Sequence, residues 1–294
     1  MSTGQLSRRS YKLIVAPYDT DEAKVALGTG KDLSALDIQF KVKRTLKAKP
    51  NTAVIRVWGL KRETRQFFST PKKLALSLEA GYNDTNELLF LGETRNAFSE
   101  QEGPEIVTTF ETGDSEKVMA AAGLSLTFSQ PQLTLEQAFN ALSQNIPQVI
   151  SPSMSKQLWA QSGVLGQITF PVLYPKPGAM DRSAARFLND ICRAAGLQWS
   201  RQNESILILP LNGTYGKEVV LNAKTGLIGS PFVDNKGLLE VKSLIQPGLR
   251  PGAKIQLQGV EIKGHYRVEE AEYQGHSAPG QKEWYCKMRC TKLG

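Results

Sequence analysis

Residues 222–258, NAKTGLIGSPFVDNKGLLEVKSLIQPGLRPGAKIQLQ, decide the fold of this chain because strand patterns and turn signals alternate within them. Hydrophobic residues alternate with polar ones over 238–242 and again over 254–258, which is the period of a half-buried strand. Breaks in the chain are predicted at Gly226, Gly229, Pro231, Pro247-Gly248 and Pro251-Gly252. The stretch contains no histidine and no cysteine. It therefore predicts the scaffold of a small β-barrel rather than a reactive site.

Short strands at close intervals are also predicted in the N-terminal part of the chain. The clearest alternation runs from Leu36 to Val42. Further strand patterns cover 53–58, 74–78, 87–94 and 104–111. A short surface helix is predicted over 61–69, before Pro71. This spacing is typical of a barrel or sandwich.

The middle of the chain changes from strand patterns to helical ones. Thr134–Gln137 fits a capping box at the start of one helix, and Ser183 begins a second helix that Gly196 ends. A hairpin is predicted around Gln202-Asn203. These patterns predict a mainly β chain with an α+β insertion. A β-barrel domain at 1–115 and another at 217–294 would flank an α+β domain at 116–216. No short-period repeat is visible, and the sequence leaves open whether the two outer segments are related barrels.

Composition narrows the class of protein. The chain has 294 residues, of which 40% are hydrophobic and 22% charged, as in globular proteins that form a hydrophobic core. No run is long enough to span a bilayer, and the N-terminus lacks the apolar region of a signal peptide. Three cysteines, Cys192, Cys286 and Cys290, are too few for a disulfide framework, which favours folding in a reducing compartment.

Several phrases of the sequence resemble the central hub proteins of phage tail baseplates, the family of the late-control D proteins. The phrases are TGLIGSP at 225–231, HYRVEEAEYQG at 265–275, WYCKMRC at 284–290, NTAVIRVWGLKRETR at 51–65, LEAGY at 78–82 with FLGE at 90–93, and the helix ending in AAGLQW at 194–199. The resemblance covers most of the chain and rests on segment order and turn phrases, because no catalytic signature is involved.

The resemblance implies a structural role without enzymatic activity or cofactor. It implies two tail-tube-like barrels in each chain and a homotrimeric ring of six similar barrels, which matches a six-fold tail tube to a three-fold spike. The implied partners are further copies of the chain, the tail tube protein and the central spike protein, with the tape-measure and baseplate wedge proteins as additional candidates. DNA would pass only as cargo, no stable membrane insertion is implied, and assembly in the host cytoplasm would place the protein in the virion tail.

Candidate interface residues come from turns, a basic cluster and one tryptophan. The basic cluster is densest around Lys41 and Lys43, which project from one side of a predicted strand, and a solvated strand face remains the alternative reading. The full set is Lys41, Lys43, Arg44, Lys47, Trp159, Thr225, Gly226, Leu227, Ile228, Gly229, Ser230, Pro231, Pro247, Arg250 and Pro251.

Two other functions remain as alternatives. The net charge of +8 leaves open a basic β-barrel module that binds nucleic acid. The carboxylates at 100–105 and 269–272 leave open a cell-wall hydrolase, although they suit solvated loops and strand edges better. Gly28–Lys31 lacks the first glycine and the Ser/Thr of a phosphate-binding loop, and His265 and His276 lack metal-ligand spacing, so no cofactor or metal is predicted.

Overall fold

The computed structural model describes residues 8–17, 30–69, 74–83, 85–113, 123–124, 132–134, 169–171, 182–194, 196–203 and 205–294. The chain forms two compact units. The first contains residues 1–45, 51–114 and 214–294, so both ends of the sequence share one unit. The second contains residues 46–50 and 115–213.

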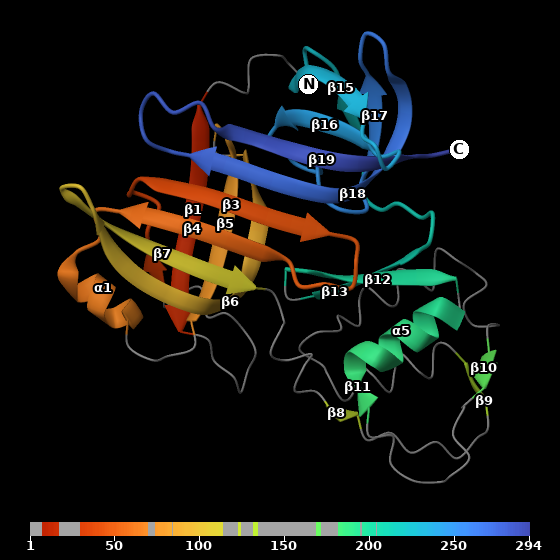
Figure 1. The fold of residues 1–294 in the computed structure, drawn as a ribbon, viewed down its shortest axis with the longest axis horizontal. Helices are drawn as coiled ribbons and strands as arrows, with labels where there is room; N and C mark the ends of the chain where they lie inside the picture. Colours follow the sequence, from red (N-terminus) through yellow and green to blue (C-terminus); the bar gives the residue numbers. More distant parts are fainter. Residues whose placement is uncertain are drawn as a thin grey trace. The chain divides into compact units, whose positions relative to one another are not determined.

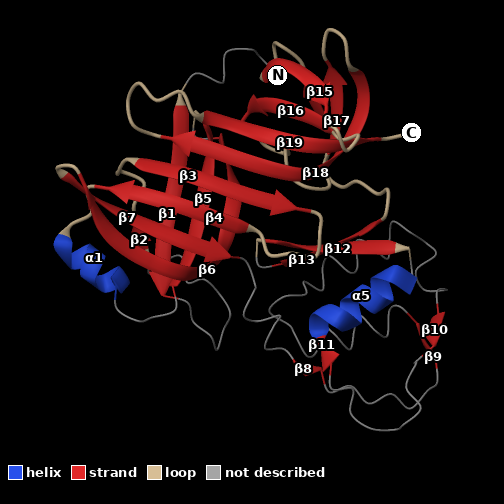
Figure 2. Ribbon diagram, viewed as in Figure 1, coloured by secondary structure: helices blue, strands red, loops and turns tan. Residues whose placement is uncertain are grey.

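The first unit is built on one 13-stranded sheet (Figures 1 and 2). Its strands are β1 (Arg9–Pro17), β2 (Lys31–Asp32), β3 (Ile38–Thr45), β4 (Thr52–Trp58), β5 (Leu74–Tyr82), β6 (Thr85–Glu102), β7 (Glu105–Gly113), β14 (Val219–Leu221), β15 (Leu227–Val233), β16 (Leu239–Leu244), β17 (Lys254–Gln258), β18 (Lys263–His276) and β19 (Trp284–Lys292). The strand order is β15-β16-β19-β18-β3-β4-β7-β6-β5-β1-β2, with β17 also beside β18 and β14 beside β17. Every pairing is antiparallel except that of β14 with β17.

The same order of five strands occurs twice in this sheet. The N-terminal segment has the order β3-β4-β7-β6-β5, and the C-terminal segment has the order β15-β16-β19-β18-β17. In each segment the fourth strand along the chain is the longest, and its ladder with the fifth strand contains a bulge, between Thr94 and Asn96 in β6 and between Val268 and Glu270 in β18. The two outer segments are therefore repeats of one strand pattern.

The core of the unit follows from the alternation of side chains along these strands. Leu239, Val241 and Ser243 of β16 are buried while the residues between them are half-exposed, as a strand with one buried face requires. Strands β1 and β5 cross β3 and β4 at a steep angle (Figure 1), and their inward side chains belong to the same hydrophobic cluster. The cluster continues through β17, β18 and β19, so one core supports both repeats.

Two elements differ from the sequence-based expectation, and one agrees. Helix α1 (Arg62–Ser69) is confirmed. The predicted break at Gly229 and Pro231 is wrong, because β15 continues through both residues by means of a register shift between Ile228 and Phe232. Strand β6 extends to Glu102, eight residues past the predicted end at 94.

The described elements of the second unit are β8 (Gly123–Leu124), β9 (Gln132–Thr134), β10 (Thr169–Pro171), β11 (Arg182–Ser183), α5 (Ala184–Ala194), β12 (Leu197–Gln202) and β13 (Ser205–Pro210). Helix α5 ends before Gly196, whose φ of 66° suits a glycine at a helix terminus. The predicted hairpin is confirmed as β12–β13, with Asn203 at φ 53°. The helix predicted after Thr134 lies outside the described residues.

The predicted fold class, mainly β with a helix-containing insertion, is confirmed. Among the described residues, no helix combines the length and the apolar character needed to cross a bilayer.

Candidate assembly interface

The two repeats are joined at one strand pair, β18 with β3. Residues Glu270–His276 of β18 pair with Gln39–Thr45 of β3, while the first part of β18 pairs with β17 in its own repeat. Strand β18 therefore changes partner at its bulge. This pair is the point at which the sheet passes from one repeat to the next.

Trp284 packs beneath this junction. Its ring lies edge-on to Phe40 at a centroid distance of 5.3 Å, and its indole Nε1 donates to the carbonyl of Gly81 at 3.1 Å. Trp284 is opposite Gly275 of β18, and Gly275 is opposite Phe40 of β3. A glycine at this crossing leaves room for both rings. The aromatic pair thus ties β19 of one repeat to β3 and β5 of the other.

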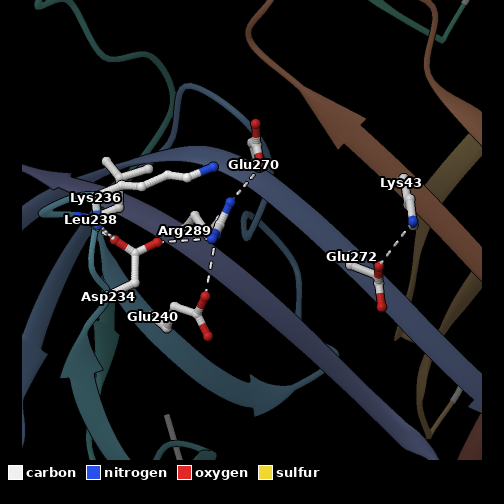
Figure 3. A network of polar contacts seen from close by, with 8 residues as sticks. All are labelled: Lys43, Asp234, Lys236, Leu238, Glu240, Glu270, Glu272 and Arg289. Carbon is white, nitrogen blue, oxygen red and sulfur yellow. Dashed lines mark hydrogen bonds and ion pairs between the residues drawn. The ribbon is translucent and has the colours of Figure 1, made fainter.

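On the solvent face of the junction, two basic residues of the predicted cluster contact a single carboxylate. Lys41 Nζ lies 3.1 Å from Glu272 Oε1, and Lys43 Nζ lies 3.7 Å from Glu272 Oε2. Figure 3 shows Lys43 and Glu272 facing each other across the β3–β18 pair. Partial burial raises the pKa of Glu272, but the hydrogen bonds from Lys41 and Gln274 and the two ammonium charges outweigh it and leave the pKa below its usual value.

We predict a small, pH-dependent loss of stability for Glu272→Gln. A carboxylate whose pKa is lower in the folded chain stabilises the fold at pH values above its unfolded pKa, and this contribution is lost as the pH falls through the folded pKa. Because both lysines are largely exposed, the loss at neutral pH is expected to be below about 1 kcal/mol. Urea melts of both proteins at pH 7 and near pH 3 measure it. A difference that persists unchanged at the acidic pH would contradict the assignment.

A second charge network surrounds Arg289 on β19 (Figure 3). Its guanidinium lies 2.8 Å from Asp234 Oδ2, 3.2 Å from Glu240 Oε1 and 3.8 Å from Glu270 Oε2. The backbone N–H of Leu238 and that of Lys236 donate to Asp234, and together with Arg289 they lower the pKa of this carboxyl. The network fixes the β15–β16 turn against β19 and β18. Its members are distant in the chain, so no local sequence pattern predicts it.

The turn from Pro247 to Pro251, predicted as an interface, contacts the N-terminal repeat of the same chain. The N–H of Gly248 donates to Glu87 Oε2, and Arg250 Nη1 lies 3.7 Å from Glu87 Oε1. The Arg250 guanidinium also lies over the Tyr215 ring, 4.8 Å from its centroid. Pro251 is buried. The described contacts of this turn therefore hold the two repeats together.

Removing the charge of Glu87 is expected to weaken this tether. Glu87→Gln keeps the size of the side chain but loses the charged hydrogen bond to Gly248 and the ion pair with Arg250, so we expect the free energy of unfolding to fall by about 1–2 kcal/mol. Chemical denaturation measures the change. Glu79→Gln is the matched control on β5, expected to stay within about 0.5 kcal/mol of the wild type, and an equal loss in both variants would contradict the tether.

The remaining predicted interface residues are distributed as follows. Arg44 points inward: it is 4% exposed and its Nη1 donates to the Leu88 and Leu89 carbonyls. Lys47 is exposed in the turn after β3. Trp159 lies outside the described residues. Thr225 closes the turn before β15, where its hydroxyl donates to the Val220 carbonyl at 2.7 Å. The other residues of that set, Gly226, Leu227, Ile228, Gly229, Ser230 and Pro231, lead into or belong to β15.

The groups considered for chemistry are engaged in structural contacts. Burial raises the pKa of the Cys192 thiol to about 12 and also raises the pKa values of Cys286 and Cys290, which disfavours a reactive thiolate. His265 Nδ1 lies 2.7 Å from Glu218 Oε1, and His276 stacks on Trp58. Within the described residues, no group of three or more His, Cys, Asp or Glu side chains is arranged to hold a metal ion.

The carboxylates weighed for a hydrolase are mostly paired with cations. Glu102 contacts Arg56, Glu269 contacts Arg267 at 2.7 Å, and Glu270 and Glu272 take part in the networks described above. These four residues therefore suit structural ion pairs.

Comparison with solved structures gives the fold a context. A 43 kDa tail protein of prophage MuSo2 from Shewanella oneidensis superposes with a TM-score of 0.59 at 9% identity, over 96% of this chain and 98% of the other. The fold is that of a phage tail protein. A tail protein from Neisseria meningitidis MC58 gives a TM-score of 0.57 at 8% identity, over 96% of each chain.

The same fold extends to secretion systems. The E. coli c3393 protein is described as a component of the type VI secretion system with structural similarity to the T4 tail proteins gp27 and gp5. It matches with a TM-score of 0.54 at 10% identity, over 88% of this chain and 74% of its own. No family model and no curated protein sequence matches the chain. The resemblance to baseplate hub proteins in the sequence is therefore confirmed at the level of the fold.

Proposed function

We propose that this chain is the structural hub of a phage tail baseplate, a homotrimeric ring that joins the tail tube to the central spike. The observation that carries the proposal is the duplicated five-strand pattern within one continuous sheet. Three copies of a two-repeat chain present six similar units, so one ring can match a six-fold tube on one face and a three-fold spike on the other. The fold shared with phage tail proteins over 96% of the chain supports this role.

In this role the protein acts through shape, as a non-enzymatic component of the virion tail. In this proposal each repeat forms a tail-tube-like barrel, and the insertion at 116–216 forms a separate α+β domain. Assembly takes place in the host cytoplasm. The stable partners are the tube and spike proteins, with the tape-measure and baseplate wedge proteins as additional partners. DNA crosses the ring only as cargo. Permanent rings of this kind bury about 2,000 Å² or more per contact.

Deletion of the coding sequence, followed by complementation from a plasmid, tests the proposal. Without the chain we expect DNA-filled heads and no complete tails in electron micrographs, because the tube has no base on which to assemble. Wild-type protein supplied in trans restores tails. Complete tails of normal length in the absence of the chain would contradict the hub role.

A further inference from the structure

Two strand edges on opposite repeats of the chain have no partner among the described strands. Strand β15 pairs with β16 on one side only, at one end of the sheet. Strand β6 pairs with β5 only over Thr85–Glu93, so beyond its bulge residues 96–102 pair with β7 alone. An open edge of this length is a template for pairing with another chain.

Each open edge carries an exposed aromatic side chain. Phe232 on β15 is 56% exposed and its neighbour Val233 is 58% exposed, while Phe98 on β6 is 37% exposed. An exposed hydrophobic strand edge is prone to pairing with another chain. These two edges are therefore the strongest candidates for contacts between copies.

The strand pairing within the chain predicts how the two open edges pair between copies. In the described chain, β3 is the first strand of its repeat and pairs with β18, the fourth strand of the other repeat, beyond the bulge of β18. The counterpart of β3 is β15, and the counterpart of the end of β18 is the end of β6. By the same rule β15 should pair with residues 96–102, and within the described chain neither segment has that partner.

The positions of the two aromatic residues agree with this rule. Across the first repeat, Lys41 is aligned through Val54 and Glu111 with Asn96, the first paired residue after the bulge. Across the second repeat, Phe232 is aligned in the same way through two strands with Glu270, again the first paired residue after the bulge. Phe232 is therefore the counterpart of Lys41, and Phe98 is the counterpart of Glu272.

We propose that β15 of one copy pairs with residues 96–102 of β6 in a second copy, and that Phe232 packs against Phe98 where Lys41 contacts Glu272 within the chain. This rests on the proposed hub function and specifies its self-interface. Because the two surfaces differ, the contact is heterologous, and repetition of it generates a ring when the rotation closes. The sheet of each copy then continues into the next through the same kind of junction that joins its own repeats.

Two complementary variants test the pairing on the full chain. Phe232→Glu blocks the β15 edge and leaves the β6 edge intact, whereas Phe98→Glu does the reverse. Under conditions in which the wild type forms trimers in native mass spectrometry, we expect each variant alone to be monomeric. An equimolar mixture is expected to form a one-to-one dimer, because one unmodified pair of edges remains. Leu211→Glu, at a side chain of similar exposure in the second unit, should remain trimeric.

Cross-linking supplies a second test that also works inside particles. Ser99 follows Asn96 at the same interval at which Tyr273 follows Glu270, and Val233 follows Phe232 as Val42 follows Lys41. Tyr273 and Val42 are paired within the chain, so the same rule places Ser99 opposite Val233. Opposed residues on paired strands lie about 4.5–5.5 Å apart at Cα, which a disulfide can bridge. The Ser99→Cys/Val233→Cys double variant should form intermolecular disulfides, and neither single variant should.

The outcomes separate this interface from the hub function. Variants that stay trimeric, a mixture that forms no dimer, or a wild type that is monomeric at every concentration would each overturn the pairing. A mixture in which only the Phe98→Glu protein self-associates would indicate a β15–β15 contact instead. If the chain is incorporated into tails but the double-cysteine variant forms no cross-links there, the pairing is wrong and the hub function stands.

Discussion

Replacement of Trp284 by alanine is expected to lower the free energy of unfolding by about 3–5 kcal/mol. The side chain is 2% exposed and packs on Phe40 and Tyr11, and its Nε1 donates to the Gly81 carbonyl. Truncation removes the transfer free energy of a large aromatic, leaves a cavity at the β18–β3 junction and leaves a buried carbonyl without its donor. Both repeats lose packing at once, so we expect a single cooperative transition at lower denaturant concentration.

Guanidinium melts followed by far-UV circular dichroism measure this loss. Tyr285→Ala is the matched control, because Tyr285 follows Trp284 on the same strand but lies on the solvent face beside Lys242 and Lys287. The control is expected to lose less than about 1 kcal/mol. Equal losses in the two variants would show that the junction core contributes no more than the surface of β19.

Valine in place of Gly275 is expected to destabilise the same junction by about 3 kcal/mol, through overpacking instead of a cavity. A Cβ at this position would lie 2.8 Å from Trp284 Cε3 and in direct conflict with the Phe40 ring. Both rings are buried, so neither can turn aside without disturbing the core. We expect β18 and β3 to separate locally, because Gly275 is paired with Phe40 across that ladder.

Hydrogen exchange resolved by mass spectrometry distinguishes this result from a general loss of stability. Peptides covering β3 and the end of β18 are expected to lose protection first, while those covering β5 keep it. Gln256→Val places the same side chain on the half-exposed side of β17 and should leave exchange unchanged. Protection retained in β3 with Gly275→Val would contradict the steric account.

The strands that sequence patterns predicted best are those with one buried face. The alternation in β3, β16 and β17 reports directly which side faces the core, and the structure has the same residues inward. Arg44 obeys the same alternation, although it was predicted at an interface. It follows Lys43 on β3, so the two-residue period places it inward with Val42, although its charge suggested the surface.

Pairing between distant strands could not be predicted in this way. The β18–β3 ladder joins the two ends of the sequence, and alternation indicates a buried face without naming the neighbouring strand. Gly229 and Pro231 indicated a break because both disrupt a regular ladder, whereas an edge strand with a bulge tolerates them. Phe98 was missed for a related reason: it lies beyond the predicted end of its strand, in the part of β6 that follows the bulge.

The most direct measurement for the central claim is the copy number of the chain in isolated tails. Particles sedimented from a native lysate and analysed by quantitative mass spectrometry should contain about three copies per tail, in fixed ratio to the tube protein, as a closed trimeric ring requires. Recovery of the chain only as a free species, absent from tail-sized particles, would contradict the hub function.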